Sequence, residues 1–119
     1  MEVKLFDSEL KVMEVLWESG DLTAGQLAKQ LKDLTGWNRN TTYTVIKKLV
    51  DKGAIARSEP GFLCHALISK EQVRQQETTQ LIDRFFSGSP ELFMATFLSG
   101  KQLSQEEVAK LRQIIDDLS

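Results

Sequence analysis

The sequence predicts a mostly α-helical chain with a small β-hairpin, arranged as a winged helix-turn-helix domain followed by a C-terminal helical segment. Capped segments with helical periodicity occupy residues 7–52, and an alternating stretch interrupted by a turn occupies residues 54–68. Helical periodicity then returns at residue 69. We therefore expect two domains, a winged helix-turn-helix over residues 1–70 and a helical domain over residues 71–119.

The first two predicted helices are short and amphipathic. Asp7 or Ser8 is expected to cap a helix that Gly20 ends. Its expected inward residues, three and four positions apart, are Leu10, Met13, Leu16 and Trp17. Thr23 and Gln26 form a T-x-x-Q capping box that opens the second helix. The expected inward residues of this helix are Leu27, Ala28, Leu31 and Leu34.

A third helix and a hairpin follow directly. Asn38 or Asn40 is expected to cap a helix that runs to Lys52, where Gly53 supplies the left-handed residue that ends it. The period then changes from helical to extended in "AIARS" and "FLCHALI", which flank a turn at residues 59–61. Three short helices followed by a hairpin are typical of a winged helix.

A serine is expected to cap each of the last three helices. These serines are Ser69, Ser89 and Ser104. Gln72 and Glu107 complete capping boxes, and Pro90 occupies a first helical position. The first of these helices is expected to run to about Phe86, so the segment after the hairpin reads as three helices with no further strand.

Composition is typical of a folded chain of about domain size. Of its 119 residues, 41% are hydrophobic and 27% are charged, which argues against wholesale disorder. No run approaches the roughly 18 apolar residues of a membrane-spanning helix, and the N-terminus lacks the apolar core of a signal peptide, so a cytoplasmic protein is expected. Cys64 is the single cysteine, which excludes an internal disulfide and a multi-cysteine metal site. No cofactor or metal site is predicted.

Positive charge is concentrated in one segment of a slightly acidic chain. The net charge is −2, but Trp37–Lys52 carries Arg39 and three lysines against a single acid, Asp51, a local balance of +3. Residues 71–119 are acidic, with a balance of −3. A negatively charged partner is therefore expected to bind within Trp37–Lys52, while the overall charge argues against unselective coating of nucleic acid.

The third helix separates into an apolar side and a polar side. At about 100° per residue, one side collects Thr42, Val45, Ile46, Leu49 and Val50. The opposite side collects Asn40, Thr41, Thr44, Lys47 and Lys48, with Arg39 at its start. Threonine loses rotamer freedom in a helix, so propensity does not explain the two outward threonines. The N-terminal end of a recognition helix faces base edges in the major groove, where threonine can bond a base or contact a thymine methyl.

These positions indicate two kinds of contact with double-stranded DNA. Contacts to phosphates are expected from Arg39, Lys47, Lys52 and Arg57, the last of which lies in the hairpin. Contacts to bases are expected from Asn40, Thr41, Thr44 and Lys48. Two alternatives stay open: these residues form an ordinary solvated helix face, or the winged helix is a protein-interaction module that does not bind DNA.

No pattern in the chain predicts an enzyme. Cys64 and His65 are adjacent on an expected strand, so their side chains point to opposite faces and cannot form a dyad or a two-ligand metal site. We expect a packed thiol and a surface histidine, and an intermolecular thiol or a redox sensor is the open alternative. The acidic residues lack the pairing of a general acid with a general base.

The C-terminal helices are expected to form a homodimer. Three helices in about 50 residues bury too little of their surface to be stable alone. A second copy would cover their apolar side chains at an interface of about 800 Å² per partner. The candidate dimerisation residues are Leu81, Phe85, Phe86, Leu92, Phe93, Phe97, Leu111, Ile114, Ile115 and Leu118. The open alternative is a monomer in which these helices fold back on the winged helix.

The stretch "WNRNTTYTVIKKLVDKGAI", from Trp37 to Ile55, resembles the penicillinase repressor family, the BlaI/MecI/CopY type of transcriptional regulator. Its most specific part is W-x(3)-T-x-x-T-x(3)-[KR]-L followed by KG, and the similarity extends to the opening "ELKVMEVLWESGDLTAGQLAKQL" and the closing "LSQEEVAKLRQII". The resemblance implies a homodimeric repressor whose winged helices bind a DNA dyad and whose C-terminal helices dimerise. It also implies DNA contacts at Thr41, Thr44 and Lys48.

The resemblance also bears on how repression is relieved. Members that respond to β-lactams are inactivated by cleavage of an Asn-Phe bond in the second C-terminal helix, and the matching pair here is Thr96-Phe97. A regulatory protease acting at Thr96-Phe97 is therefore an implied partner, with the asparagine replaced. Members that respond to copper carry a C-terminal cysteine cluster, which this sequence lacks. The sequence does not predict the releasing signal.

Overall fold

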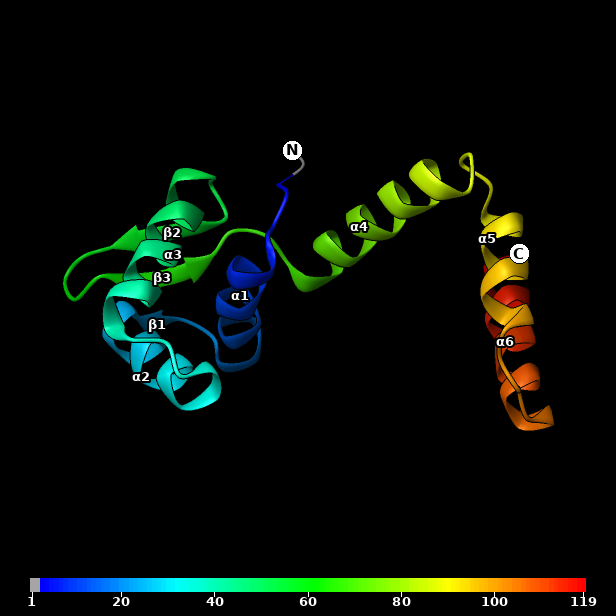
Figure 1. Ribbon diagram of the computed structural model, residues 1–119, viewed down its shortest axis with the longest axis horizontal. Helices are drawn as coiled ribbons and strands as arrows, with labels where there is room; N and C mark the ends of the chain where they lie inside the picture. Colours follow the sequence, from blue (N-terminus) through cyan, green and yellow to red (C-terminus); the bar gives the residue numbers. More distant parts are fainter. Residues whose placement is uncertain (1–2) are drawn as a thin grey trace. The chain divides into compact units, whose positions relative to one another are not determined.

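The computed structural model describes residues 3–119, which form α-helices and one small β-sheet (Figure 1). In chain order the elements are α1 (Asp7–Ser19), β1 (Leu22–Thr23), α2 (Ala24–Thr35), α3 (Arg39–Asp51), β2 (Ile55–Ser58), β3 (Leu63–Ala66), α4 (Lys70–Phe85), α5 (Pro90–Ser99) and α6 (Gln105–Leu118). They form two compact units, one ending at Glu77 and the other running from Thr78 to Ser119, so α4 contributes to both. Within residues 3–119, every helix is too short or too polar to traverse a lipid bilayer.

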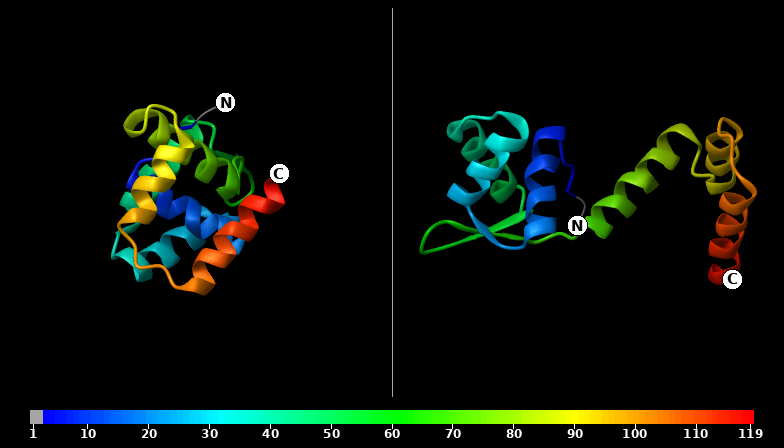
Figure 2. Two further views of the ribbon diagram at one scale, coloured as in Figure 1. Left: turned by 90° about the vertical axis from the view of Figure 1, so that its right-hand side faces the viewer. Right: turned by 90° about the horizontal axis from the view of Figure 1, so that it is seen from below.

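The first unit places three helices against a three-stranded antiparallel sheet. β3 is the central strand, with β2 on one side and β1 on the other. Cys64 faces Leu22 across one ladder and Arg57 across the other. Figure 2 shows α1, α2 and α3 on one face of the sheet, and the turn between β2 and β3 projecting beyond the helices. The predicted winged helix-turn-helix fold is therefore confirmed.

The core of this unit lies where α1, α2 and α3 meet the sheet. Its largest fully buried apolar side chains are Met13, Leu27, Leu31, Ile46, Leu49 and Ile55. Burial of each such side chain contributes about 1.5 to 3 kcal/mol to folding. Trp17 is only partly buried and donates its indole N–H to the carbonyl of Ile68 at 2.9 Å, which attaches the segment before α4 to α1.

Three details of the N-terminal half differ from the sequence prediction. Neither Asp7 nor Ser8 caps α1, because Phe6 is the N-cap and its backbone N–H donates to the Glu9 carboxylate at 2.8 Å. Leu34 points away from the core and is 71% exposed, since α2 turns into its C-terminal cap two residues later. The strand β1 was not predicted, because two residues are too short for a detectable alternation.

The expected caps of the other helices are present. Thr23 and Gln26 form the reciprocal capping box of α2, with bonds of 3.1 and 2.9 Å. Asn38, rather than Asn40, caps α3. The three predicted serine caps accept backbone N–H groups at the starts of α4, α5 and α6: Ser69, Ser89 and Ser104.

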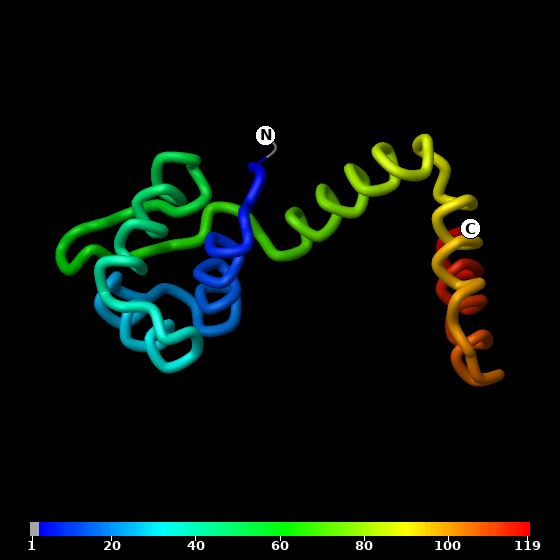
Figure 3. The backbone as a smooth tube through the Cα atoms, in the orientation of Figure 1, coloured from blue at the N-terminus to red at the C-terminus, as the bar shows by residue number. Residues whose placement is uncertain are grey.

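The second unit has little interior of its own. No residue of α5 or α6 is buried. An edge-to-face contact joins Phe86 to Phe93 at 5.3 Å between ring centres, and Phe93 stacks on Phe97 at 5.9 Å. Figure 3 traces α5 turning back into α6 through residues 100–104. Large apolar side chains therefore stay exposed on this unit, including Phe85, Ile114, Ile115 and Leu118.

We predict that Thr42→Val stabilises the protein. The Thr42 hydroxyl is buried on the core side of α3 and has no hydrogen-bond partner among the described residues. Replacing it with a methyl group removes an unsatisfied buried polar atom, so the free energy of unfolding should rise by about 1 kcal/mol in urea denaturation. Thr44→Val is the matched control, because the exposed Thr44 hydroxyl donates to Asn40 and its loss should bring no gain. Equal or lower stability of Thr42→Val would contradict this prediction.

Candidate nucleic-acid interface

The burial pattern of α3 divides its polar residues from its apolar residues. Its buried residues are Thr42, Val45, Ile46 and Leu49. The residues on the other side are all exposed: Asn40, Thr41, Thr44, Lys47 and Lys48. The packed side fixes the rotation of the helix about its axis, so these five side chains are available to a partner.

Hydrogen bonds inside α3 hold the two outward threonines. Asn38 Oδ1 accepts from the Thr41 backbone N–H at 2.8 Å and from the Thr41 hydroxyl at 3.0 Å. The Thr44 hydroxyl donates to the Asn40 carbonyl at 2.9 Å. Each hydroxyl hydrogen is thus already used within the helix. In this arrangement both hydroxyls can only accept a further hydrogen bond, while their methyl groups remain free for apolar contact.

The charge on this side of α3 is positive. Lys47 and Lys48 are exposed and form no ion pair among residues 3–119. Arg39 is exposed in the first turn of α3 and donates from Nη2 to the Tyr43 hydroxyl at 2.8 Å. The N-terminus of α3 adds the partial positive charge of the helix dipole. The exposed acid Asp51 lies at the opposite, C-terminal end of the helix.

The hairpin contributes Arg57, which is held in place on two sides. Its Nε and Nη2 atoms bond Glu59 Oε1 at 2.8 and 2.7 Å, and its guanidinium lies 3.7 Å from the centre of the Phe62 ring. The Phe62 backbone N–H and the Arg57 guanidinium lower the pKa of Glu59, so this carboxylate stays ionised at neutral pH. Arg57 retains the hydrogens of Nη1 for another acceptor.

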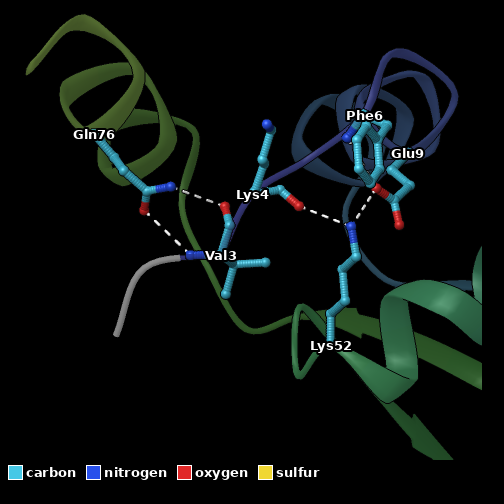
Figure 4. A network of polar contacts seen from close by, with 6 residues as sticks. All are labelled: Val3, Lys4, Phe6, Glu9, Lys52 and Gln76. Carbon is cyan, nitrogen blue, oxygen red and sulfur yellow. Dashed lines mark hydrogen bonds and ion pairs between the residues drawn. The ribbon is translucent and has the colours of Figure 1, made fainter. Parts of the chain in front are cut away.

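Lys52 is directed elsewhere. Its ammonium contacts Glu9 Oε1 at 2.5 Å and the Lys4 carbonyl at 2.8 Å, as Figure 4 shows. Glu9 is almost completely buried, and its second oxygen has no partner among the described residues. Lys52 is the only cation paired with Glu9 among residues 3–119, and its expected phosphate contact stays a prediction.

The N-terminal segment also contacts α4 through a pair of hydrogen bonds. Gln76 accepts from the Val3 backbone N–H at 3.3 Å and donates to the Val3 carbonyl at 2.9 Å (Figure 4). Residues 3–6 thus link the end of α3, through Lys52, to α4 within the first unit. No local sequence pattern predicts these contacts, because their partners lie more than 40 residues apart.

Cys64 and His65 occupy opposite faces of β3. Cys64 is fully buried, and burial raises the pKa of its thiol to about 11, so the thiolate is scarce at neutral pH. His65 is exposed, with Nδ1 2.8 Å from Asp21 Oδ1. The two side chains cannot converge on one substrate or ligand.

Tyr43 and Phe62, which are not among the predicted site residues, connect α3 to the hairpin. Tyr43 and Phe62 pack edge to face with 5.9 Å between ring centres. The spacing of Arg39 and Tyr43 on one helix could have indicated their contact, since residues four apart are neighbours on a helix surface. The contact between Tyr43 and Phe62 needs the folded hairpin and leaves no signal in the sequence.

Comparisons with known proteins relate the chain to repressors. A family model described as penicillinase repressor matches residues 5–117. The penicillinase repressor of Bacillus licheniformis is 28% identical over 96% of this chain and 91% of its own length. The methicillin resistance regulatory protein MecI of Mammaliicoccus sciuri is 23% identical over 95% and 94% of the two chains. The solution structure of the DNA binding domain of the repressor BlaI matches with a TM-score of 0.53 and 28% identity, over 56% of this chain and 84% of that one.

We predict that Lys52→Met destabilises the fold. The change leaves the buried Glu9 carboxylate without its cation, so the free energy of unfolding should fall by about 2 to 4 kcal/mol in urea denaturation at neutral pH. Lys47→Met is the matched control. Lys47 is exposed and unpaired in the described structure, so this variant should stay within about 0.5 kcal/mol of the unmodified protein. Equal stabilities of the two variants would mean that the Glu9–Lys52 contact contributes nothing.

Proposed function

The chain belongs to the penicillinase repressor family, and we propose that it is a homodimeric transcriptional repressor whose winged helices bind a pseudo-palindromic operator. One observation carries the proposal. The side of α3 that carries Thr41, Thr44, Lys47 and Lys48 is exposed next to a projecting hairpin, while the other side is buried in the core. A helix presented in this way can enter the major groove of DNA, which is wide enough to admit it.

The N-terminal half of α3 is proposed to read bases. Thr41 and Thr44 have donated their hydroxyl hydrogens within the helix, so they would accept from the exocyclic amino groups of adenine or cytosine. Their methyl groups would lie against thymine methyl groups. Asn40 and Lys48 are proposed to add further base contacts, because both are exposed on the same side of the helix.

Contacts to phosphates are proposed for Arg39, Lys47 and Arg57. All three are exposed and cationic, and Arg57 lies on the hairpin, from which it can reach a backbone segment away from α3. Such contacts position the protein on the duplex without reading its sequence. The phosphate contact expected of Lys52 is not part of this proposal, because its partner Glu9 is buried, whereas Glu59, the partner of Arg57, is exposed to solvent.

The second unit is proposed to provide the dimer interface. Its apolar side chains are exposed, and α5 and α6 contain no buried residue. A second copy that covered these side chains would give the unit the interior that it lacks as a single chain. Two recognition helices about 34 to 36 Å apart, or a multiple of that distance, would then read two symmetric half-sites. For function we propose a DNA-binding domain over residues 1–70 and a dimerisation domain over residues 71–119, whereas the compact units divide between Glu77 and Thr78, inside α4.

A protease that relieves repression at Thr96-Phe97 remains a prediction. This peptide bond lies inside α5, and both residues are exposed. Cleavage would need α5 to unwind locally, because proteases generally take their substrates in extended form. The separation of the DNA-binding residues from α5 along the chain would let cleavage remove dimerisation without touching the recognition helix.

We predict that Thr44→Ala and Lys47→Ala affect DNA binding in different ways. Lys47→Ala should weaken binding to specific and random duplexes alike and lower the slope of log K against log salt by about 0.9, the share of one phosphate contact. Thr44→Ala should reduce the preference for the specific duplex and leave the slope unchanged, because it removes a base contact. Fluorescence anisotropy across a salt series measures both.

The same titrations test the function itself. The affinity of a repressor for duplex DNA should fall steeply as the salt concentration rises. A winged helix that only binds other proteins should show no such salt-dependent binding to the duplex. Absence of binding by the unmodified chain at low salt would refute the proposed function.

We predict that the full chain is a dimer at micromolar concentration. Sedimentation equilibrium should give twice the chain mass of 13.5 kDa. Ile115→Glu should shift the equilibrium toward the single chain, since Ile115 is 59% exposed and a charge there would oppose burial. Glu106→Gln is the matched control in the same helix, on a residue outside the apolar set. A single-chain mass for the unmodified protein would remove the proposed dimer.

A further inference from the structure

A continuous series of side-chain contacts crosses from α3 to the hairpin. The Arg39 guanidinium carbon lies 5.0 Å from the centre of the Tyr43 ring, and its Nη2 atom donates to the Tyr43 hydroxyl. Tyr43 meets Phe62 edge to face at an interplanar angle of 88°. The Arg57 guanidinium carbon lies 3.7 Å from the centre of the Phe62 ring. An aromatic pair with an arginine at each end therefore joins the two elements that are proposed to contact DNA.

Two hydrogen bonds hold the backbone of Phe62. Its N–H donates to Glu59 Oε2 at 3.1 Å, and its carbonyl accepts from the Ala24 N–H at 2.9 Å. Its φ of 54° lies in the left-handed region, which a phenylalanine occupies only when surrounding contacts hold it there. Phe62 is thus a fixed point between the hairpin turn and the start of α2.

The charges at the two ends of the series lie in different surroundings. Arg39 stands beside the first turn of α2, where a Cβ at Gly25 would lie 3.7 Å from Arg39 Nη2. Arg57 shares its Nε and Nη2 hydrogens with Glu59. Both guanidinium groups keep donors that no described hydrogen bond uses, and both are exposed.

We propose that Tyr43 and Phe62 are positioning residues that hold Arg39 and Arg57 ready for two phosphates of one duplex. The inference rests on the proposed function and extends it to residues that do not touch DNA themselves. An arginine that moves freely in the unbound protein loses side-chain freedom when a complex immobilises it, and this loss weakens binding. The contact of each arginine with a fixed aromatic ring orders its side chain before DNA binds, so less freedom is lost in the complex. The Tyr43–Phe62 contact holds α3 and the hairpin at a fixed separation.

The experiment measures binding of the full chain to a random-sequence duplex at several salt concentrations by fluorescence anisotropy. Phosphate contacts do not depend on sequence, so the operator need not be known. Tyr43→Phe removes the hydroxyl that orders Arg39 and keeps the ring. It should weaken binding by about two- to fivefold, because the ring contact stays and only part of the ordering of Arg39 is lost. The salt slope should not change, because Arg39 still reaches its phosphate in the complex. Arg39→Ala should lower the slope by about 0.9.

A double-variant comparison separates positioning from other roles. If Tyr43 acts through Arg39, Tyr43→Phe should have no further effect in the Arg39→Ala background. A direct Tyr43 contact with DNA, or a general loosening of the fold, would give the same loss in both backgrounds and overturn the inference. Phe62→Leu should behave toward Arg57→Ala in the same way. Phe62→Tyr, which keeps the ring, should bind like the unmodified chain.

The outcomes distinguish this inference from the function on which it rests. If the unmodified chain binds the duplex and Tyr43→Phe and Phe62→Leu bind equally well, the positioning role is wrong and the function stands. If the unmodified chain fails to bind at low salt, both are wrong. Thermal melting by circular dichroism should show each variant folded, since the changes at Tyr43 and Phe62 keep a large apolar side chain and the two arginines are exposed.

Discussion

The burial of one side of α3 is the constraint on which the other features of the interface depend. Ile46 and Leu49 are fully inaccessible in the core between α1, α2 and the sheet. Turning the helix by one residue would expose side chains whose burial contributes about 1.5 to 3 kcal/mol each. The core therefore fixes which side chains of α3 point outward. Thr41 and Thr44 lie on the outward side because the packed residues occupy the other side.

The two ends of α3 are specialised by their surroundings. The C-terminal end is tied down, since Lys52 neutralises the buried Glu9 and bonds the Lys4 carbonyl. The N-terminal end carries the Asn38 cap, the outward threonines and the helix dipole, and it is exposed. Both properties favour DNA binding, because a recognition helix that moved against its domain would lose conformational freedom on binding and so bind more weakly.

Local patterns predicted the helices, and tertiary contacts decided what those patterns missed. The capping boxes that begin at Thr23 and Ser104 were predictable, because the two residues of each box lie three positions apart in the sequence. The outward side of α3 followed from periodicity alone. The strand β1 and the partner of Lys52 depend on residues distant in sequence, as does the contact between Tyr43 and Phe62. For the same reason, an exposed lysine and a paired lysine look alike in a sequence.

The most direct measurement is a nuclear magnetic resonance titration of the full, isotope-labelled chain with a duplex selected for binding from a random library. The account predicts that backbone amide shifts change at residues 39–48 and in the hairpin around Arg57, with the buried side of α3 keeping its packing. Saturable binding that left these amides unchanged and perturbed the surface around Leu34 instead would contradict the claim that the outward side of α3 enters DNA.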